Sequence, residues 1–294
     1  MDRVLRLVVL TGLLFFATGK AVMSDSRSIV TITTPRGAEQ AFILIKPDNA
    51  IASIILFAGG SGLLRLNRTP PLQVGATDFV SGNFLVRARE KFAAHGFIVA
   101  VVDAPSDRQK EGMSPYFLIG KDHATDIGAV ADYLKREAGL PVWLVGTSAG
   151  SWSAALGAIG AGRDGIATSA IGGLVLTSTV TRLPQGSEFA RALPTFTSEH
   201  PDGVMSIALD EIRVPTLIVS HSDDACYATP AADAPALAKH LTHAPKVEIA
   251  LISGGDPPRS DPCEAYSQHG FLGVELQAVD RIAEFIKANG GSGR

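Results

Sequence analysis

One segment of the 294-residue chain constrains its fold more than any other: an apolar run leads directly into a Gly-x-Ser-x-Gly pattern at residues 146–150. Residues 142–145 are all apolar, as in a buried strand, and residues 149–159 are rich in small side chains, as in a closely packed helix. A sharp turn from strand to helix leaves little room two residues before and after its apex, and glycine suits both positions. The pattern predicts that Ser148 lies at the apex of such a turn.

A match of this kind is weak evidence alone, since a chain with 30 glycines can contain it in an ordinary glycine-rich turn. The flanking strand and helix favour a nucleophilic serine instead, because backbone N–H groups and the dipole at a helix start stabilise negative charge. An alcohol is a poor nucleophile at neutral pH. Ser148 therefore requires a general base, and the base requires an orienting carboxylate.

Short runs rich in valine and isoleucine alternate with longer stretches of helical periodicity along the chain. This alternation predicts one domain over residues 22–294, an α/β fold with a mostly parallel eight-stranded sheet and helices on both faces. A turn at residues 35–37 predicts that the first two strands are antiparallel. The expected strands span residues 29–33, 41–46, 53–57, 97–103, 142–146, 173–177, 216–220 and 247–252, and the expected helices span residues 84–94, 124–137, 149–159, 232–241 and 277–288.

Two long segments that contain several glycines and prolines interrupt this alternation. Residues 58–82 follow the third expected strand, and residues 178–212 form a short cap-like insertion between the sixth and the seventh. Loops of this length in compact domains are usually functional or mobile. Both segments begin where a parallel strand ends, which is the edge at which open parallel sheets bind their ligands.

The N-terminus has the layout of a secretory signal peptide. Arg3 and Arg6 precede a mainly apolar run at residues 7–17, and small residues follow around Ala21. We expect cleavage after Ala21 and export to the periplasm or the medium. The alternative is a membrane anchor, but a membrane-spanning helix needs about 20 apolar residues and this run ends before Lys20.

The charge of the chain excludes one class of partner. The formal net charge is −3 at pH 7 and the pI is about 6.2, so the chain lacks the basic surface that nucleic-acid binding requires. Loss of residues 1–21 removes one acidic and three basic residues, which changes the net charge from −3 to −5. The sequence contains no metal, nucleotide or flavin motif, so we expect no cofactor and a small-molecule substrate.

The general base should come from a histidine at the same edge of the sheet as Ser148. Two histidines end the helix before the eighth strand, which places them at the opposite edge. His269 lies in the loop that leaves the eighth strand, so it is the expected base. For the carboxylate, the seventh strand ends shortly before Asp223 and Asp224, and either of them could orient His269.

These residues together resemble those of the α/β-hydrolases, and in particular the dienelactone hydrolase-like esterases. The resemblance covers about residues 28–290 and rests on the turn at residues 146–150, the aspartate after the seventh strand, and His269 in a His-Gly-Phe sequence. It implies a serine hydrolase that cleaves a carboxylic ester through an acyl-enzyme. In the family pattern the acid comes a few residues after a strand that ends in His-Gly, which implies Asp224 as the acid.

The resemblance also implies an oxyanion hole with two backbone donors. One donor is the N–H of Ala149, directly after the nucleophile. The other comes from the glycine-rich loop after the third strand, from Gly60 or Ser61. This loop resembles the His-Gly-Gly-Gly stretch of related esterases, with Ala58 at the histidine position.

The chain has two cysteines, Cys226 and Cys263, and neither belongs to a CxxC metal or redox site. Cys226 is two residues after Asp224, and Cys263 is six residues before His269. In the implied fold these two loops must meet so that the acid reaches the base. The resemblance therefore implies a disulfide between them, which an exported protein allows.

Three functions fit these residues. The first is hydrolysis of a carboxylic ester with a small or medium acyl group, because the insertion at residues 178–212 is short for the lid of a lipase. The second is amide or peptide cleavage, or acyl transfer, by the same side chains. The third is a binding protein on a hydrolase scaffold, which the complete set of Ser148, Asp224 and His269 disfavours.

Overall fold

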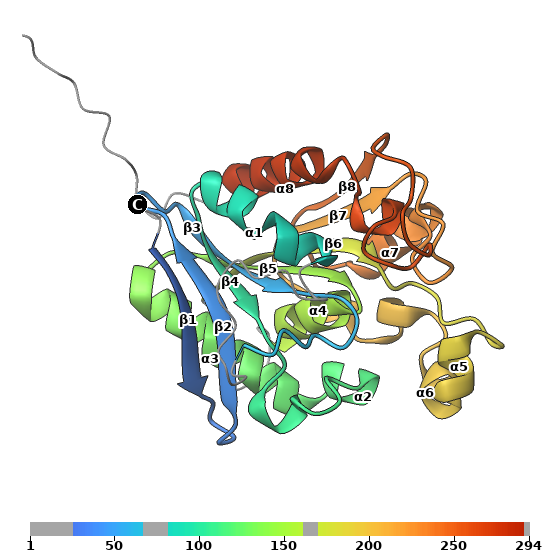
Figure 1. The fold of residues 1–294 in the computed structure, drawn as a ribbon, viewed down its shortest axis with the longest axis horizontal. Coiled ribbons are helices and arrows are strands. Elements are labelled where there is room, and N and C mark those ends of the chain that lie inside the picture. Colours follow the sequence, from blue (N-terminus) through green and yellow to red (C-terminus); the bar gives the residue numbers. More distant parts are fainter. Residues whose placement is uncertain (1–25, 67–81, 161–169, 291–294) are drawn as a thin grey trace, which may run out of the picture.

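The computed structural model describes residues 26–66, 82–160 and 170–290, and its central feature is an eight-stranded sheet (Figure 1). The strands are β1 (Ser26–Thr33), β2 (Glu39–Lys46), β3 (Ala52–Phe57), β4 (Phe97–Val102), β5 (Val142–Ser148), β6 (Ile171–Thr179), β7 (Thr216–His221) and β8 (Val247–Ile252). Their order in the sheet is β1-β2-β4-β3-β5-β6-β7-β8. The β1–β2 and β2–β4 pairs are antiparallel and the other five pairs are parallel, which confirms the predicted fold class.

Helices cover both faces of the sheet, because its central strands are apolar on both sides. Along β3, Ile54 and Leu56 pack into one buried cluster, whereas Ile55 and Phe57 pack into another on the opposite face. The first cluster is covered by α1 (Phe84–Ala94) and α8 (Glu275–Asn289), and the second by α3 (Lys121–Ala138), α4 (Gly150–Gly160) and α7 (Ala234–His240) (Figure 1). The loops carry the short helices α2 (Pro115–Leu118), α5 (Glu188–Ala192) and α6 (Pro194–Glu199).

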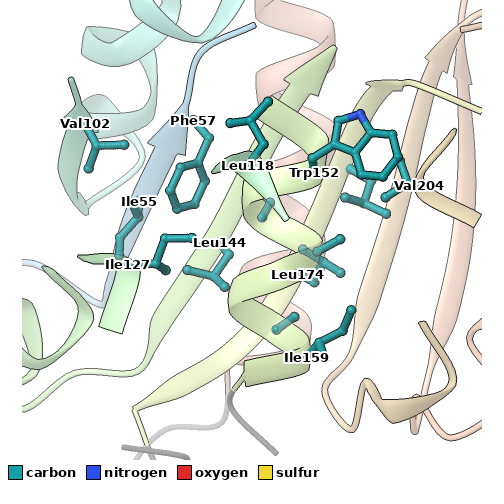
Figure 2. Packing of buried hydrophobic residues seen from close by; sticks show 14 of the residues in the cluster. Ile55, Phe57, Val102, Leu118, Ile127, Leu144, Trp152, Ile159, Leu174 and Val204 are labelled. Carbon is teal, nitrogen blue, oxygen red and sulfur yellow. The ribbon is translucent and has the colours of Figure 1, made fainter. Parts of the chain in front are cut away.

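Small residues allow α4 to lie close to the sheet. A Cβ atom on Gly157 would come within 2.8 Å of the Leu144 side chain and within 2.9 Å of the Ile127 side chain, so a larger residue there would have to displace them. Figure 2 shows Leu144, Ile127 and Trp152 among the apolar side chains gathered around this helix. The packing fixes the position of α4, and with it the turn that joins β5 to α4.

The expected elements are present, with differences at their ends. β5 and β6 each run two residues beyond their expected ends, so the cap-like insertion begins at residue 180 and contains α5 and α6. The helix expected at residues 232–241 begins at Ala234, because Pro235 lacks an N–H and favours the first turn of a helix. The residues before it form a single 3₁₀ turn instead.

Part of the sequence prediction falls on residues that the structure does not describe. This holds for the signal peptide expected at residues 1–21 and for residues 67–81 of the loop after β3, which stay predictions. None of the described helices is both long enough and apolar enough to span a membrane.

His123, in the first turn of α3, is a buried histidine with a single hydrogen-bond partner. Its Nε2 atom lies 2.8 Å from Ser153 Oγ, and no described residue is placed to pair with Nδ1. The rings of Phe57 and Phe117 pack against it. Burial lowers the pKa of His123 from its ordinary 6.5 to about 3, and the positive charge of Arg36 acts in the same direction. The folded protein therefore keeps this side chain neutral.

The lowered pKa of His123 predicts a loss of stability in mild acid. Below about pH 6.5 the unfolded chain binds a proton at His123, whereas the folded protein does not bind it until about pH 3. Above pH 6.5 the neutral His123 costs the folded protein no stability. Below pH 6.5 the free energy of unfolding falls by about 1.4 kcal/mol for each pH unit. In urea unfolding at pH 7, 6 and 5, we expect the unfolding free energy of His123→Leu to fall less steeply than that of the wild type. Ser153→Ala keeps the histidine and should retain the steep slope, and equal slopes in all three proteins would contradict the assignment.

Candidate active site

The structure contains the sharp turn that the sequence predicts, since β5 ends at Ser148 and α4 begins at Gly150. Ser148 has a φ of 53°, in the left-handed region that residues other than glycine rarely adopt. A Cβ atom on Gly146 would lie 2.2 Å from the carbonyl oxygen of Gly150, and one on Gly150 would lie 2.1 Å from that of Phe57. The backbone around Ser148 therefore packs too closely for any residue but glycine at these two positions.

Hydrogen bonds on both sides hold the strained Ser148 turn. Ser151 Oγ donates to the Ser148 carbonyl oxygen at 2.5 Å, and Thr177 Oγ1 on β6 donates to the Gly146 carbonyl oxygen at 3.1 Å. A residue in this conformation costs about 1–3 kcal/mol and persists only where the surroundings enforce it. Strain of this kind is common at functional sites, and Ser148 itself is partly exposed.

Asp224 and His269 meet in the loops after β7 and β8. His269 Nδ1 lies 3.1 Å from Asp224 Oδ2, and both side chains are buried. Asp223 is exposed, and its backbone N–H donates to His221 Nδ1 at 3.1 Å. The structure thus pairs His269 with Asp224, the carboxylate that the family resemblance implies, and leaves Asp223 at the surface.

Thr229 is a third member of this buried contact. Its Oγ1 atom donates to Asp224 Oδ2 at 2.8 Å and lies 3.0 Å from His269 Nδ1. The other carboxylate oxygen, Oδ1, accepts the N–H of Cys226 at 2.9 Å. A proton on His269 Nδ1 satisfies the contact to Asp224, so this tautomer leaves Nε2 as a proton acceptor.

The backbone of His269 is also fixed from two directions. Ser178 Oγ, at the end of β6, donates to the His269 carbonyl oxygen at 2.7 Å. The His269 N–H donates to Ser267 Oγ at 3.2 Å. Because the strand that carries Ser178 pairs directly with β5, these bonds hold the histidine in a defined position relative to Ser148.

A disulfide joins the loop of the acid to the loop of the base. Cys226 and Cys263 are bonded, with their Cα atoms 4.5 Å apart and a sequence separation of 37. This is the pairing that the sequence predicts. A closed loop of this length adds about 3–4 kcal/mol of stability in the chain-entropy account, and the bridge keeps Asp224 and His269 in adjacent loops.

Ser148 and His269 line the same cavity, which has a volume of about 530 Å³. The three predicted oxyanion residues, Gly60, Ser61 and Ala149, line it as well. Its walls are mainly apolar and include Leu63, Met113, Leu118, Trp152, Val180, Leu183 and Phe189. The last three of these come from the segment between β6 and β7, so the cap-like insertion forms part of the cavity. Within the described residues, no group of three or more His, Cys, Asp or Glu side chains is placed to hold a metal ion.

The loop after β3 passes directly over Ser148. A Cβ atom on Gly59 would lie 2.9 Å from Ser148 Cβ, so this contact also depends on glycine. Gly60, the next residue, has a positive φ of 66°. The carbonyl oxygen of Ser61 accepts the N–H of Met113 at 2.9 Å, which ties the loop to the segment after β4.

Asp103, directly after β4, holds the next part of this loop. Its buried carboxylate accepts the backbone N–H groups of Leu64 and Leu66 at 2.6 and 2.8 Å, and that of Ala104 at 2.8 Å. Burial raises the pKa of Asp103, and the backbone hydrogen bonds act against this rise. The carboxylate is thus a structural anchor for the loop that covers Ser148.

The sequence prediction did not include three polar residues that belong to this site: Thr229, Asp103 and Asn83. Asp103 carries a usable signal, because a carboxylate directly after an apolar parallel strand lies at the edge where such sheets bind ligands. Thr229 has no such signal, since only the folded loop brings it to Asp224. Asn83 lines the cavity beside Gly59 of the loop after β3, a position that sequence spacing does not reveal.

Comparison with known proteins shows a shared fold. No protein-family model and no curated protein sequence matches the chain. An esterase of Pyrococcus furiosus matches with a TM-score of 0.61 at 16% identity, over 97% of this chain and 99% of that chain. Brefeldin A esterase, a bacterial homologue of human hormone-sensitive lipase, matches with a TM-score of 0.61 at 18% identity, over 95% and 81%.

A dienelactone hydrolase of Anabaena variabilis has the same architecture. It matches with a TM-score of 0.57 at 14% identity, over 91% of this chain and 99% of that chain. Likenesses at such low identity show the fold alone. The chain therefore has the α/β-hydrolase fold, as the resemblance in its sequence implies.

Proposed function

We propose that this chain, which has the α/β-hydrolase fold, is a serine hydrolase that cleaves a carboxylic ester through an acyl-enzyme on Ser148. The observation that carries the proposal is a buried Asp224–His269 hydrogen bond of 3.1 Å whose histidine lines the same cavity as Ser148. A nucleophile, a base and an orienting acid are the groups that acyl transfer to a serine requires. The named structures of similar fold are esterases and a dienelactone hydrolase, which supports hydrolysis.

The proposed reaction begins when Ser148 Oγ attacks the ester carbonyl carbon. His269 Nε2 accepts the hydroxyl proton, and Asp224 holds the ring in the required tautomer and stabilises its positive charge. The negative charge on the carbonyl oxygen is stabilised by the N–H of Ala149 and by that of Gly60 or Ser61. His269 then protonates the leaving alcohol, and the same base activates the water that releases the acid from Ser148.

The walls of the cavity favour a substrate with a small or medium apolar acyl group. Trp152, Leu183 and Phe189 present apolar side chains to the cavity that Ser148 lines, and its volume of about 530 Å³ is in the range of small-molecule pockets. We include the cap-like insertion in the substrate site, because it supplies two of these three side chains.

We also propose that the protein is exported and loses residues 1–21. The disulfide supports this location, since such bonds persist in oxidising compartments. N-terminal sequencing of the exported protein tests the proposal, with Val22 as the expected first residue. An intact N-terminus on membrane-bound protein would contradict it.

A panel of p-nitrophenyl esters and matching p-nitroanilides, with acyl chains from acetyl to octanoyl, tests the type of bond that is cleaved. We expect turnover of the esters, with slower turnover of the anilides that have the same acyl group. Faster turnover of the anilides would assign the site to amide or peptide bonds. No turnover of either set by the folded protein would favour a binding protein instead.

The proposed acyl pocket predicts a change in chain-length preference. Leu183 is buried and lines the cavity, so Leu183→Ala should create space there. We expect a rise in kcat/KM for octanoate relative to butyrate of up to about fourfold for each methylene that the new space accepts. Leu209, a buried leucine in the same insertion, does not belong to the cavity wall, so Leu209→Ala serves as the control. An unchanged preference in Leu183→Ala, or the same change in Leu209→Ala, would contradict this pocket.

A further inference from the structure

Asn83 lies beside the Ser148 turn, although the reaction described above does not use it. The residue is partly buried, immediately precedes α1, and lines the same cavity as Ser148 and His269. A Cβ atom built on Gly59 would lie 2.9 Å from Ser148 Cβ and 3.3 Å from Asn83 Nδ2. The amide nitrogen of Asn83 and the nucleophile therefore both border the narrow space beside Gly59.

A hydrogen bond to the helix fixes the orientation of the Asn83 amide. Asn83 is the N-cap of α1, and its Oδ1 atom accepts the N–H of Leu85 at 3.1 Å. An N–H donor requires an acceptor opposite it, so the oxygen and not the nitrogen of the amide must face Leu85. The Nδ2 donors therefore point away from Leu85, and Nδ2 is the amide atom next to Gly59.

The backbone around Asn83 is tied to the loop that carries His269. The Arg87 guanidinium donates to the carbonyl oxygens of Gly82, Ala265 and Gly270, and it also pairs with Glu275 at 2.9 Å. Gly270 is the residue after His269, and Gly82 is the residue before Asn83. One side chain thus holds Asn83 and the proposed base in a fixed relation, and a donor held in this way needs no rearrangement during a reaction.

We propose that Asn83 Nδ2 is a third hydrogen-bond donor to the oxyanion, in addition to the N–H of Ala149 and that of Gly60 or Ser61. This inference rests on the proposed function. As Ser148 Oγ bonds to the carbonyl carbon, the π-electron pair moves to the carbonyl oxygen, and Nδ2–H donates to that oxygen without transferring its proton. When the pair returns, the bond to the leaving alcohol breaks, and the alcohol takes the proton from His269.

A donor of this kind acts mainly on the transition state. The carbonyl oxygen carries little charge in the bound ester and nearly a full charge in the tetrahedral intermediate, so the hydrogen bond strengthens as the reaction proceeds. Loss of the donor should therefore lower kcat and leave KM nearly unchanged. If Asn83 served only as the helix cap, any substitution that preserves the cap would leave kcat unchanged.

Asn83→Asp and Asn83→Ser separate these two roles, because aspartate and serine are good N-caps that lack the Nδ2 donor. With p-nitrophenyl butyrate we expect kcat to fall about 100-fold in Asn83→Ser and further in Asn83→Asp, whose charge repels the oxyanion. KM should change less than threefold, and the thermal midpoint should stay close to that of the wild type. Asn49→Asp, in an exposed turn at the other end of β3, is the matched control and should keep full activity.

Inhibition by 1,1,1-trifluoro-2-heptanone, which forms a tetrahedral adduct with a serine, supplies a second readout. We expect its inhibition constant to rise in both variants by the same factor as kcat falls. If kcat and the inhibition constant were unchanged in the two variants, the inference would be overturned and the proposed function would stand. The same holds if kcat fell only in proportion to the amount of folded protein. Ester turnover by the wild type without labelling of Ser148 by a phosphonate would instead refute the proposed function, and the inference with it.

Discussion

Replacement of Ser148 by alanine is expected to lower kcat for p-nitrophenyl butyrate by at least about 10,000-fold and to leave the fold intact. The serine oxygen forms the bond to the acyl group in the proposed mechanism, so its loss removes the acyl-enzyme. The folded structure should persist because alanine has the same Cβ atom as serine. Steady-state kinetics measure the loss of kcat, and a thermal unfolding curve tests whether the fold persists.

Ser222→Ala is a suitable control for this variant. Ser222 is an exposed serine in the loop after β7, two residues before Asp224, and it does not line the cavity. Its replacement should leave kcat within about twofold of the wild type. Substantial ester turnover by Ser148→Ala would show that another group carries the acyl transfer.

The second large effect concerns the two neighbouring aspartates after β7. Asp224→Asn is expected to lower kcat by about 10,000-fold, because asparagine can favour the wrong tautomer of His269 and cannot stabilise its positive charge. Asp223→Asn is expected to change kcat by no more than about twofold, since Asp223 is exposed and its side chain makes no hydrogen bond to His269. Asp223→Asn therefore serves as the matched control.

Kinetics of the two asparagine variants with p-nitrophenyl butyrate decide between the aspartates. The reverse pattern, an inactive Asp223→Asn with an active Asp224→Asn, would reassign the acid. Nearly full activity in both variants would remove the carboxylate from the mechanism. Asp224 also accepts hydrogen bonds from Thr229 and from the Cys226 N–H, so the thermal midpoint of Asp224→Asn must be compared with that of the wild type.

The sequence was sufficient to predict the sheet, because each central strand is buried on both faces. β3, β4 and most of β5 contain apolar residues almost without interruption, and such runs indicate parallel strands under two layers of helices. The Ser148 turn was predictable for a similar reason. The two glycines around it are required because a Cβ atom at either position would lie only 2.1 or 2.2 Å from a backbone oxygen.

The local sequence pattern is insufficient to decide whether Asp223 or Asp224 pairs with His269. Both residues follow the same strand, and only the course of the loop makes one buried and the other exposed. The preference for Asp224 over Asp223 comes from the family pattern, because the periodicity of apolar residues does not distinguish the two. Thr229 is harder still, because its contacts with Asp224 and His269 join residues 5 and 40 positions away.

The position of Asp103 directly after β4 indicates the ligand-binding edge of the sheet, but the sequence does not show what Asp103 or Asn83 contacts there. Asp103 binds backbone N–H groups of the loop after β3 and Asn83 lies beside that loop, whose path depends on tertiary packing rather than on residue type. Asp103 holds Leu64 and Leu66, and Asn83 faces Gly59, so both roles appear only when the loop is folded over Ser148. Polar residues at the ends of strands and helices have many local uses, and their sequence context does not distinguish these uses.

The central claim is that Ser148 is the nucleophile, and covalent labelling with a fluorophosphonate tests it most directly. Such a reagent reacts with an activated serine, and tryptic cleavage places Ser148 in a peptide that spans residues 137–163. We predict a single adduct on this peptide, located at Ser148 by fragmentation and absent from the Ser148→Ala protein. An adduct on any other residue, or none on the folded wild-type protein, would contradict the account.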